Sequence, residues 1–438
     1  MRAVSAFAVL CLGGAFAPVS ADTLPKADAL FPDLDMKSVK LGQLLFYDPI
    51  LSGNKSVACA TCHHPDFATA DGVSLGIGDG GIGLGPNRKI DPDNPPEERV
   101  PRHAPALFNL GTAEFSVMFH DGRLEADSSQ PHGLRTPLGG DMVAGFKSVL
   151  SAQAMFPVLS PDEMAGHYGE NDISTAVRQG RLSHEGGAWD ILSGRITEIP
   201  EYRQRFDAVI GANAEIEFTD IANVIADFIA FEWRADDSPF DRYLRGEAGL
   251  SDTALAGMEL FYGPAGCSSC HSGQFQTDHG FHAIAVPQIG PGKAPAFLDH
   301  MRDDGRMAVT GQIKDQYAFR TPSLRNVAQT APYGHSGAYA TLEGIVGHHT
   351  APTASLEAYD QSQAIFPVSL GHDDWSVQNS ARERAEIATA NQLRASPMRA
   401  EDMAQIIAFL ESLSDPVSLT GRLGIPETVP SGLPLDPR

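Results

Sequence analysis

Two stretches of the chain space their apolar residues as one face of a helix does. In each stretch the apolar residues recur every three or four positions, which predicts an amphipathic helix with one buried side. Thr219 is the expected N-cap of the first helix, and Asp415-Pro416 is expected to stop the second. The apolar positions are Ile221, Val224, Ile225, Phe228 and Phe231 in the first stretch, and Met403, Ile406, Ile407, Leu410 and Leu413 in the second.

Outside these helices, alternating strand patterns are few and long connectors are common. The connectors at residues 76–105 and 280–311 are rich in glycine and proline, and the whole chain contains 43 Gly and 31 Pro. Its 438 residues, of which 42% are hydrophobic, exceed what one core usually organises. We therefore expect a mainly α protein with long loops and two domains.

Segments of the first half of the chain recur in the second half. Two of the three pairs share one displacement, 257 − 42 = 215 residues, which predicts two duplicated domains in tandem. The boundary is expected in the polar stretch 236–251, which gives domains at residues 22–240 and 241–438. The pairs are Gly42-Gln-Leu-Leu-Phe-Tyr47 with Gly257-Met-Glu-Leu-Phe-Tyr262, Arg102-His-Ala-Pro105 with Arg320-Thr-Pro322, and His120-Asp-Gly122 with His335-Ser-Gly337.

The N-terminus has the pattern of a secretory signal. Arg2 precedes an apolar run over residues 3–17, and Val19-Ser20-Ala21 supplies the small residues of a cleavage site. We expect cleavage after Ala21, which removes residues 1–21. No later apolar stretch reaches the roughly 18 residues that a membrane span needs. The mature protein is therefore expected in the periplasm, without a membrane span.

The chain is strongly acidic, with a formal net charge of −23. A field of this sign repels nucleic acid and attracts positively charged partners. Nucleic-acid binding is therefore excluded from the expected functions.

Four of the five cysteines fall into two copies of one motif. Cys11 lies inside the apolar run of the leader and is expected to leave with it. The others form Cys59-Ala-Thr-Cys62-His63 and Cys267-Ser-Ser-Cys270-His271. Two thiols three positions apart reach the two vinyl groups of a porphyrin, and the adjacent imidazole ligates the iron. The motifs predict two covalently bound haem c groups, with His63 and His271 as iron ligands.

Other uses of the two cysteine pairs are open at this point. An exported redox disulfide, two structural disulfides or a zinc site would use the same residues. A zinc site needs its two halves close together, whereas these motifs lie 267 − 59 = 208 residues apart and each carries its own histidine. Two independent haems fit the pattern better.

Together these motifs resemble the bacterial di-haem cytochrome c peroxidase family, which includes the MauG type of protein-modifying enzyme. The resemblance covers nearly the whole mature chain. It implies two cytochrome-c-like domains, with hydrogen peroxide reduced at the N-terminal haem and electrons entering at the C-terminal haem from a small cytochrome c or cupredoxin. A homodimer, as in relatives, is left open. The matching segments are residues 41–65, 105–109, 119–123, 238–244, 257–271 and 321–337.

Cleavage of peroxide needs a base above the first haem that takes a proton and returns it. Glu163 and Gln153 match the distal Glu and Gln of the family with the same separation, so the resemblance implies that Glu163 moves the proton and Gln153 positions peroxide or the base. Taken alone, Ser160-Pro-Asp-Glu163 also fits a helix start with a capping-box Glu. Residues 126–147 form an apparent insertion near this side, with no assigned role.

The sixth ligand of the second haem is usually Met in the family, but no Met lies between Met307 and Met398. The corresponding position reads Gly347-His348-His349. The resemblance therefore implies His349 as the distal ligand, with His348 as the alternative. Without the resemblance, both are ordinary surface histidines. A His in place of Met removes the thioether that raises the potential of a haem.

The family usually has a Trp between the two haems, where this sequence has His120. His120 would relay electrons, but it is a poorer hole carrier than Trp, which disfavours the MauG type. Residues 76–101 contain no His of the kind that blocks the peroxide site in some relatives, so the first haem is expected to be open. Arg123 and Arg325 are expected near propionates or interdomain carboxylates, or in ordinary surface ion pairs.

The resemblance also implies a calcium ion between the domains. It would be held by an Asn side chain and by backbone carbonyls that correspond to Thr330 and Pro332. The Asn position is occupied by His103. Calcium prefers oxygen ligands, so His103 argues against an unchanged site, although waters and carbonyls can complete one.

Two other functions stay open. A MauG-like enzyme would oxidise residues of a tightly bound partner protein, and the missing Trp argues against it. A non-enzymatic electron carrier would need two six-coordinate irons, and the absence of a blocking His argues against that.

Overall fold

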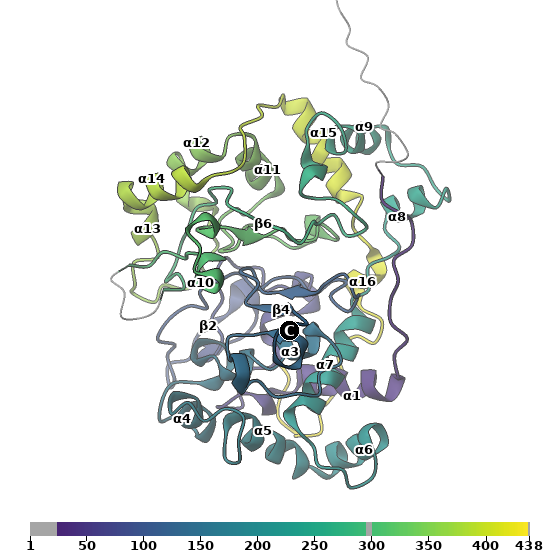
Figure 1. The fold of residues 1–438 in the computed structure, drawn as a ribbon, viewed down its shortest axis with the longest axis vertical. Coiled ribbons are helices and arrows are strands. Elements are labelled where there is room, and N and C mark those ends of the chain that lie inside the picture. The colour runs from purple at the N-terminus through teal and green to yellow at the C-terminus, as the bar shows by residue number, and fades with distance from the viewer. Residues whose placement is uncertain (1–23, 295–299, 437–438) are drawn as a thin grey trace, which may run out of the picture.

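The computed structural model describes residues 24–294 and 300–436, so the expected signal at residues 1–21 lies outside the described part. As predicted, the chain is mainly helical with long loops. Figure 1 shows the helices of the first half below and most helices of the second half above. No helix in the described ranges has the length and apolar character needed to cross a bilayer.

The α-helices are mostly short. The most extensive helix pairs are α1 with α7 in the first half and α9 with α15 in the second. Those up to residue 250 are α1 (Met36–Tyr47), α2 (Cys59–Cys62), α3 (Val149–Gln153), α4 (Asp172–Arg178), α5 (Ala188–Thr197), α6 (Pro200–Ile210), α7 (Phe218–Glu232) and α8 (Pro239–Leu244). Those that follow are α9 (Asp252–Phe261), α10 (Met307–Thr310), α11 (Leu342–Thr350), α12 (Pro352–Glu357), α13 (Ser376–Asn379), α14 (Ala381–Ala390), α15 (Ala400–Glu411) and α16 (Pro416–Thr420).

The strands form small antiparallel sheets, β1-β2, β3-β4-β5 and β6-β7. In the last sheet, Phe281 pairs with Arg320 and His282 pairs with Phe319. The short strands agree with the scarcity of alternating patterns in the sequence. They are β1 (Gly81–Ile82), β2 (Lys89–Ile90), β3 (Val117–Met118), β4 (Leu124–Ala126), β5 (Leu134–Arg135), β6 (Phe281–His282) and β7 (Phe319–Arg320).

Helices α1 and α7 cross at a glycine, and α9 and α15 repeat the arrangement. A Cβ atom at Gly42 would lie 1.8 Å from the backbone oxygen of Val224, and one at Gly257 would lie 1.8 Å from that of Gln405. Only glycine allows so close an approach of two backbones. The sequence repeat therefore corresponds to the same helix crossing in both halves. The division at residues 240 and 241 remains a prediction.

The predicted helix around residues 221–231 begins earlier than expected. Thr219 was the expected N-cap, but α7 starts at Phe218 and Glu217 occupies the cap position. The backbone N–H of Glu217 donates to the Asp220 carboxylate, 3.0 Å away, which satisfies a donor at the helix start. The predicted apolar face is correct, because Ile221 and its helical neighbours lie in the first hydrophobic cluster.

The apparent insertion at 126–147 is an outlying hairpin tied back to α7. Its strand β5 pairs with β4. The Lys147 ammonium lies 2.7 Å from the Asp227 carboxylate, and the backbone N–H of Lys147 donates to the Asn223 side chain. The insertion therefore extends the first half without separating from it.

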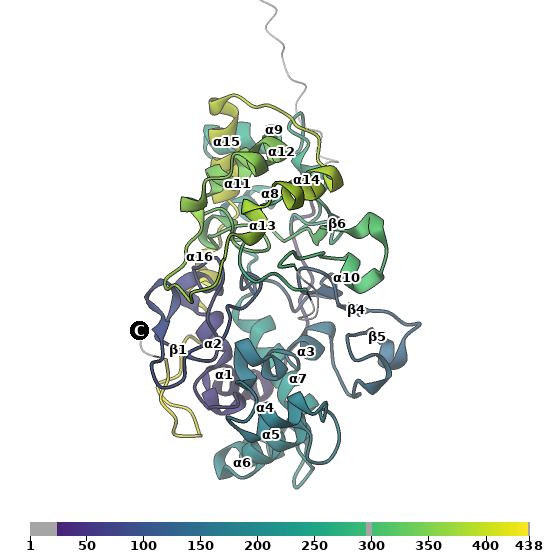
Figure 2. The same cartoon turned by 90° about the vertical axis from the view of Figure 1, so that its left-hand side faces the viewer.

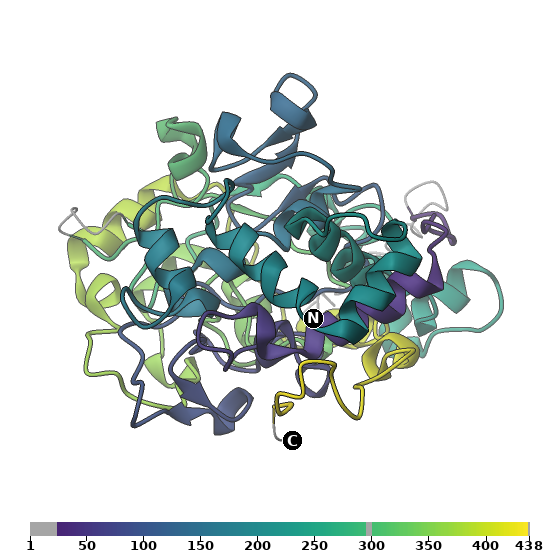
Figure 3. The same cartoon turned by 90° about the horizontal axis from the view of Figure 1, so that it is seen from below.

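The C-terminal tail leaves the second half and packs against the first. The backbone N–H groups of Leu423 and Gly424 donate to the Glu232 carboxylate, at 2.7 Å each. The Ser431 hydroxyl donates to Asp48, also at 2.7 Å. Figure 2 shows the yellow tail beside α1, and Figure 3 shows it next to the purple helix from below.

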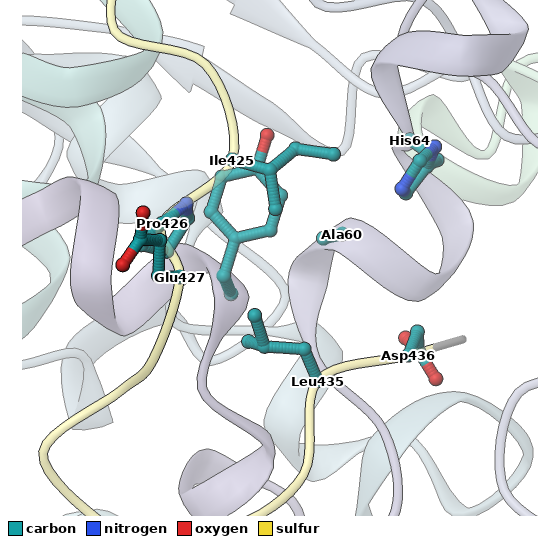
Figure 4. Close-up of a pocket in the computed structure, with 8 residues that line it drawn as sticks. Ala60, His64, Ile425, Pro426, Glu427, Leu435 and Asp436 are labelled. Atoms are coloured by element: carbon teal, nitrogen blue, oxygen red, sulfur yellow. The ribbon is translucent and has the colours of Figure 1, made fainter. Parts of the chain in front are cut away.

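The tail also closes a cavity of about 240 Å³ beside the first cysteine motif. Ile425, Leu435 and Asp436 of the tail line one side of this cavity, and Ala60 and His64 line the other (Figure 4). The side of the first motif that carries Ala60 and His64 therefore faces Ile425, Leu435 and Asp436 of the tail.

Candidate functional site

The first cysteine motif forms α2 and leaves its histidine at the end of that helix. The Nδ1 atom of His63 bonds to the backbone oxygen of Thr69, 2.9 Å away. A carbonyl can only accept, so Nδ1 carries a proton, and the backbone of Pro105 is a further hydrogen-bond partner of the His63 ring. Burial lowers the pKa of His63, which keeps its ring neutral. Cys59 and Cys62 are unpaired thiols, and burial raises the pKa of each to about 12.

The second motif repeats this geometry. The Nδ1 atom of His271 donates to the backbone oxygen of Gln276 at 3.1 Å, and burial lowers the pKa of His271 to about 4. Cys267 and Cys270 are also unpaired thiols. Each motif thus offers two thiols and one imidazole, which is the donor set of a covalently attached haem.

A second imidazole stands beside His271. The ring centroids of His271 and His349 are 6.5 Å apart. Metal–imidazole bonds are about 2 Å long, so an iron between two axial imidazoles holds their centroids roughly 6 Å apart. The Nδ1 atom of His349 donates to the backbone oxygen of Ile345 at 2.8 Å, which leaves Nε2 with a free lone pair. The spacing and the tautomer fit a haem iron between the two rings.

The neighbouring His348 is bonded at both nitrogens. Its Nδ1 lies 2.9 Å from the Tyr339 hydroxyl, and its Nε2 donates to the backbone oxygen of Ile284 at 2.7 Å. Only 1% of His348 is exposed. Ligation by His348 would break a buried hydrogen bond, whereas ligation by His349 breaks none of those described.

Glu163 lies on a single wide helical turn, Pro161–Ala165, that closes by a hydrogen bond from the backbone N–H of Ala165 to the oxygen of Ser160 at 2.9 Å. The alternative capping box is not formed, because the Ser160 side chain caps no backbone donor. Within the described ranges, the Glu163 carboxylate accepts no hydrogen bond. It is therefore free to bond to a ligand.

The electrostatic surroundings place Glu163 near the first motif. Burial raises its pKa, and the positive charges of Lys293 and Arg123 act in the opposite direction. Burial raises the pKa of Cys62, and nearby negative charges, including that of Glu163, raise it further. Gln153 ends α3, and its side chain makes no hydrogen bond to the described residues.

His120 lies where the two halves of the chain meet. Its Nε2 donates to the backbone oxygen of His103 at 3.0 Å, and its own backbone oxygen accepts from the N–H of Arg320 at 2.7 Å. Burial, together with the Arg102 charge, lowers the pKa of His120 to about 3. The ring is therefore neutral and fixed in one tautomer between the halves.

A buried ion-pair network surrounds His120. The Arg102 guanidinium lies 2.7 Å from Asp121 and 2.7 Å from Asp303. Burial alone would raise the pKa of Asp121, but Arg102 and Arg123 outweigh it and lower the pKa to about 2. The network joins residues of both halves through charge.

Arg123 and Arg325, expected near propionates or carboxylates, each contact a buried aspartate. Arg123 lies 3.1 Å from Asp121, and Arg325 lies 2.7 Å from Asp241. Both carboxylates are nearly inaccessible, so these are not ordinary surface ion pairs.

The residues at the expected calcium position are a poor match for that ion. The His103 ring donates from Nδ1 to the backbone oxygen of Val73 at 2.9 Å, and its backbone N–H donates to the oxygen of His335. Burial lowers the pKa of His103 to about 4, so the side chain is a neutral nitrogen ligand. The nearest carboxylate described for His103 is that of Asp71, 3.9 Å from its Nδ1.

Comparison with known proteins identifies the family. Residues 36–249 match the family described as di-haem cytochrome c peroxidase. Methylamine utilization protein MauG of Methylorubrum extorquens is 31% identical over 332 residues, which cover 74% of this chain and 70% of that protein. The chain belongs to the di-haem cytochrome c peroxidase family. Another relative, cytochrome c551 peroxidase of Nitrosomonas europaea, is 28% identical over 308 residues, 70% of this chain and 71% of that protein.

Solved structures share the di-haem peroxidase fold. A MauG-like protein associated with microbial copper homeostasis has a TM-score of 0.56 and 24% identity, over 90% of this chain and 94% of that one. The diheme peroxidase BthA from Burkholderia thailandensis has a TM-score of 0.60 and 20% identity, over 98% of this chain and 100% of that one. At these identities the likeness concerns the fold alone.

Two cationic residues of this family member escaped the sequence analysis. The Lys293 side chain is exposed, and partial burial together with the Arg123 charge lowers its pKa, while Glu163 opposes this shift. Burial lowers the pKa of Arg320 to about 10, and in the described ranges this guanidinium has no carboxylate partner. The alignment of Arg320 with Arg102 in the repeat was the available signal. The sequence of the connector 280–311 contains no pattern that singles out Lys293.

Proposed function

We propose that this protein is a periplasmic di-haem peroxidase that reduces hydrogen peroxide to water. Peroxide would react at the haem held by Cys59, Cys62 and His63. Electrons from a small cytochrome c or cupredoxin would enter at the haem held by the second motif. The observation that carries this proposal is the difference between the two sites. His271 has a facing imidazole at the spacing for an iron, whereas His63 has no such ring contact in the described residues.

In this proposal His349 is the distal ligand of the second haem, and His348 is not a ligand. The single described hydrogen bond of the His349 ring, from Nδ1 to the backbone oxygen of Ile345, leaves Nε2 free for iron. With His271 and His349 both bound to its iron, a haem at this site would pass electrons and would have no position left for peroxide.

Glu163 would be the proton carrier at the first site. The haem supplies the two-electron cleavage of the oxygen–oxygen bond. Glu163 takes a proton from one peroxide oxygen and returns it to the other, and two further protons enter with the two electrons, so that each peroxide yields two waters. Burial supports the role, because it raises the pKa of Glu163 towards the working pH. Gln153 would orient the peroxide or the carboxylate.

Residues between the motifs would serve electron transfer and charge balance. His120 lies between the halves and bonds to both His103 and Arg320, which suits a relay position. The Arg320 guanidinium lacks a carboxylate partner in the described ranges, so a haem propionate would supply its counter-charge. The donor protein would carry positive charge, because this chain has a net charge of −23. We include no calcium, because His103 does not supply an oxygen ligand.

A MauG-like oxidation of a partner protein is the second candidate. It is favoured by the relative named methylamine utilization protein MauG, at 31% identity. The position of His120, where the family usually has a Trp, argues against long-range sharing of oxidising equivalents.

Spectroscopy of the holoprotein with added peroxide tests the peroxidase proposal. We expect one high-spin and one low-spin haem, perturbation of the high-spin signal by peroxide, and its recovery on addition of reduced cytochrome c with matching oxidation of that donor. Two low-spin haems and no turnover would indicate an electron carrier. Peroxide consumption without donor oxidation, but with a modified partner protein, would indicate the MauG-like reaction.

A further inference from the structure

We propose that Asn54, Asp79 and Asn171 act as a clamp that positions the Glu163 carboxylate. Hereafter these three residues are called the Asn54 clamp. The inference rests on the proposed role of Glu163 as proton carrier. It adds positioning residues that lie away from the peroxide and act through the backbone of the catalytic turn.

The turn that carries Glu163 supplies no helical partner for three of its own carbonyl groups. The N–H groups of Glu163, Met164 and Ala165 all point to the oxygen of Ser160, at 3.2, 3.0 and 2.9 Å. No further helical turn follows, so the carbonyls of these three residues have no partners within the helix. Wide turns of this kind are rare, and they frequently occur at functional sites.

Each of these three carbonyls accepts a hydrogen bond from a different segment. The oxygen of Glu163 accepts from the backbone N–H of Asp79 at 3.0 Å, and that of Met164 accepts from the N–H of Gly53 at 2.7 Å. The oxygen of Ala165 accepts from the side-chain amide of Asn171 at 2.9 Å. The turn is thus held at three consecutive residues.

Side-chain bonds join these donors to one another. The Asn54 amide donates to the Asp79 carboxylate at 3.0 Å, and the Asn54 side-chain oxygen accepts from Asn171 at 2.8 Å. Asp79 also accepts from Ser56 at 3.1 Å and from Asn94 at 3.0 Å. Asp79 is 1% exposed, so its bonds do not compete with bulk water. Asn54 therefore couples the donor at Glu163 to the donor at Ala165.

Two glycines bring the clamping segments into direct backbone contact with the turn. A Cβ atom at Gly78 would lie 2.4 Å from the Glu163 oxygen and 2.7 Å from its Cα. A Cβ at Gly53 would lie 1.9 Å from the Ala165 oxygen. The Cα of Glu163 is therefore fixed by packing as well as by hydrogen bonds.

Fixing this Cα matters because the carboxylate itself has no hydrogen-bond partner among the described residues. Its position is set only by its own rotamer and by the backbone beneath it. A displacement of about 1 Å at a reacting group can cost on the order of a hundredfold in rate. Loosening the clamp should therefore lower kcat without changing the haem ligands.

The substitution Asn171→Asp isolates the clamp. Asn171 also caps α4 by accepting from the N–H of Ser174 at 2.7 Å. An aspartate keeps this acceptor and is an equally good N-cap, but it loses the amide that donates to Ala165 and Asn54. The matched control is Asn223→Asp, which loses the amide bond to the Gly145 oxygen and keeps the acceptor for Lys147, away from the Glu163 turn.

We expect Asn171→Asp holoprotein to retain both haems, to have a lower thermal midpoint because Ala165 and Asn54 each lose a donor, and to lose about 10- to 100-fold in kcat for peroxide. Asn223→Asp should keep the wild-type kcat. As a second variant, Asn54→Ser removes the link between the two donors and should have the same effect as Asn171→Asp. Unchanged kcat in both Asn171→Asp and Asn54→Ser overturns the clamp.

The background variant Glu163→Gln separates this inference from the proposed function. If Glu163→Gln alone leaves kcat unchanged, the proposed role of Glu163 is wrong and the clamp falls with it. If Glu163→Gln is inactive but Asn171→Asp is not impaired, only the clamp is wrong. If the clamp acts through Glu163, adding Asn171→Asp to Glu163→Gln causes no further loss, and an additive loss contradicts it.

Discussion

His348 and His349 are adjacent on α11, with ring planes at 89°, and use their nitrogen atoms differently. Both nitrogens of His348 are bonded to protein groups, whereas His349 bonds through Nδ1 alone. Because the rings are at right angles, the His348 ring is buried in the protein and the His349 ring lies beside His271.

This difference predicts opposite spectra for two neighbouring substitutions. His349→Ala should open an axial position and convert the second haem from low spin to high spin. His348→Ala should keep it low spin, because the lost bonds to Tyr339 and Ile284 do not involve iron. Electron paramagnetic resonance of the ferric holoproteins measures both outcomes, and a high-spin second haem in His348→Ala alone would reverse the assignment.

Glu163 predicts a pH limit on activity. A base must be ionised, so kcat/KM should fall as the pH drops through the pKa of Glu163. Burial raises this pKa above the ordinary value of 4.5, so the fall begins at a higher pH than for an exposed glutamate. Glu163→Gln should lower kcat/KM by about 10²- to 10⁴-fold and abolish this limb. Glu185→Gln, at an exposed position, is the control and should leave the profile unchanged.

The glycine crossings predict a stability contrast. Gly42→Ala and Gly257→Ala force a methyl group against a backbone oxygen and should each cost about 1 to 3 kcal/mol or more. Gly194, inside α5, has open space around it, so Gly194→Ala should stabilise by about 0.4 to 1 kcal/mol. Urea unfolding followed by tryptophan fluorescence gives the comparison. A neutral Gly42→Ala would mean that α1 and α7 do not cross this closely.

His103 predicts insensitivity to calcium removal. With an imidazole in place of an oxygen ligand, chelation by EDTA should change peroxidase turnover by less than about twofold. Calorimetric titration of the chelator-treated holoprotein with calcium chloride should show no saturable heat. Loss of turnover with EDTA and its recovery with calcium would show that carbonyls and water complete the site without an oxygen side chain.

Local signals were sufficient for much of the fold and part of the candidate site. The spacing of apolar residues predicted the buried faces of α7 and α15, although it misplaced the cap at Thr219. The aligned Gly42 and Gly257 proved to be equivalent helix crossings. The cysteine motifs and the adjacent histidines depend on short-range spacing, which a sequence displays directly.

The clamp and Lys293 could not be predicted in this way. Asn54, Asp79 and Asn171 are short polar residues in loops, and such residues look the same in sequence when they bond to each other and when they bond to water. Lys293 becomes significant only because two distant parts of the chain meet, whereas for Arg320 the alignment with Arg102 was an available signal. The path of the loops, which decides these contacts, leaves no periodic pattern.

The contact between Ser431 and Asp48 joins positions separated by 383 residues. A polypeptide emerging from its N-terminus cannot make this contact until the segment that contains Ser431 has been synthesised. Closing so large a loop costs entropy, and this cost is offset only by the contacts that the tail makes when it docks. The part of the molecule that is made first is thus completed last, and the face of the Cys59–Cys62 helix towards Ile425 and Leu435 is uncovered during that interval.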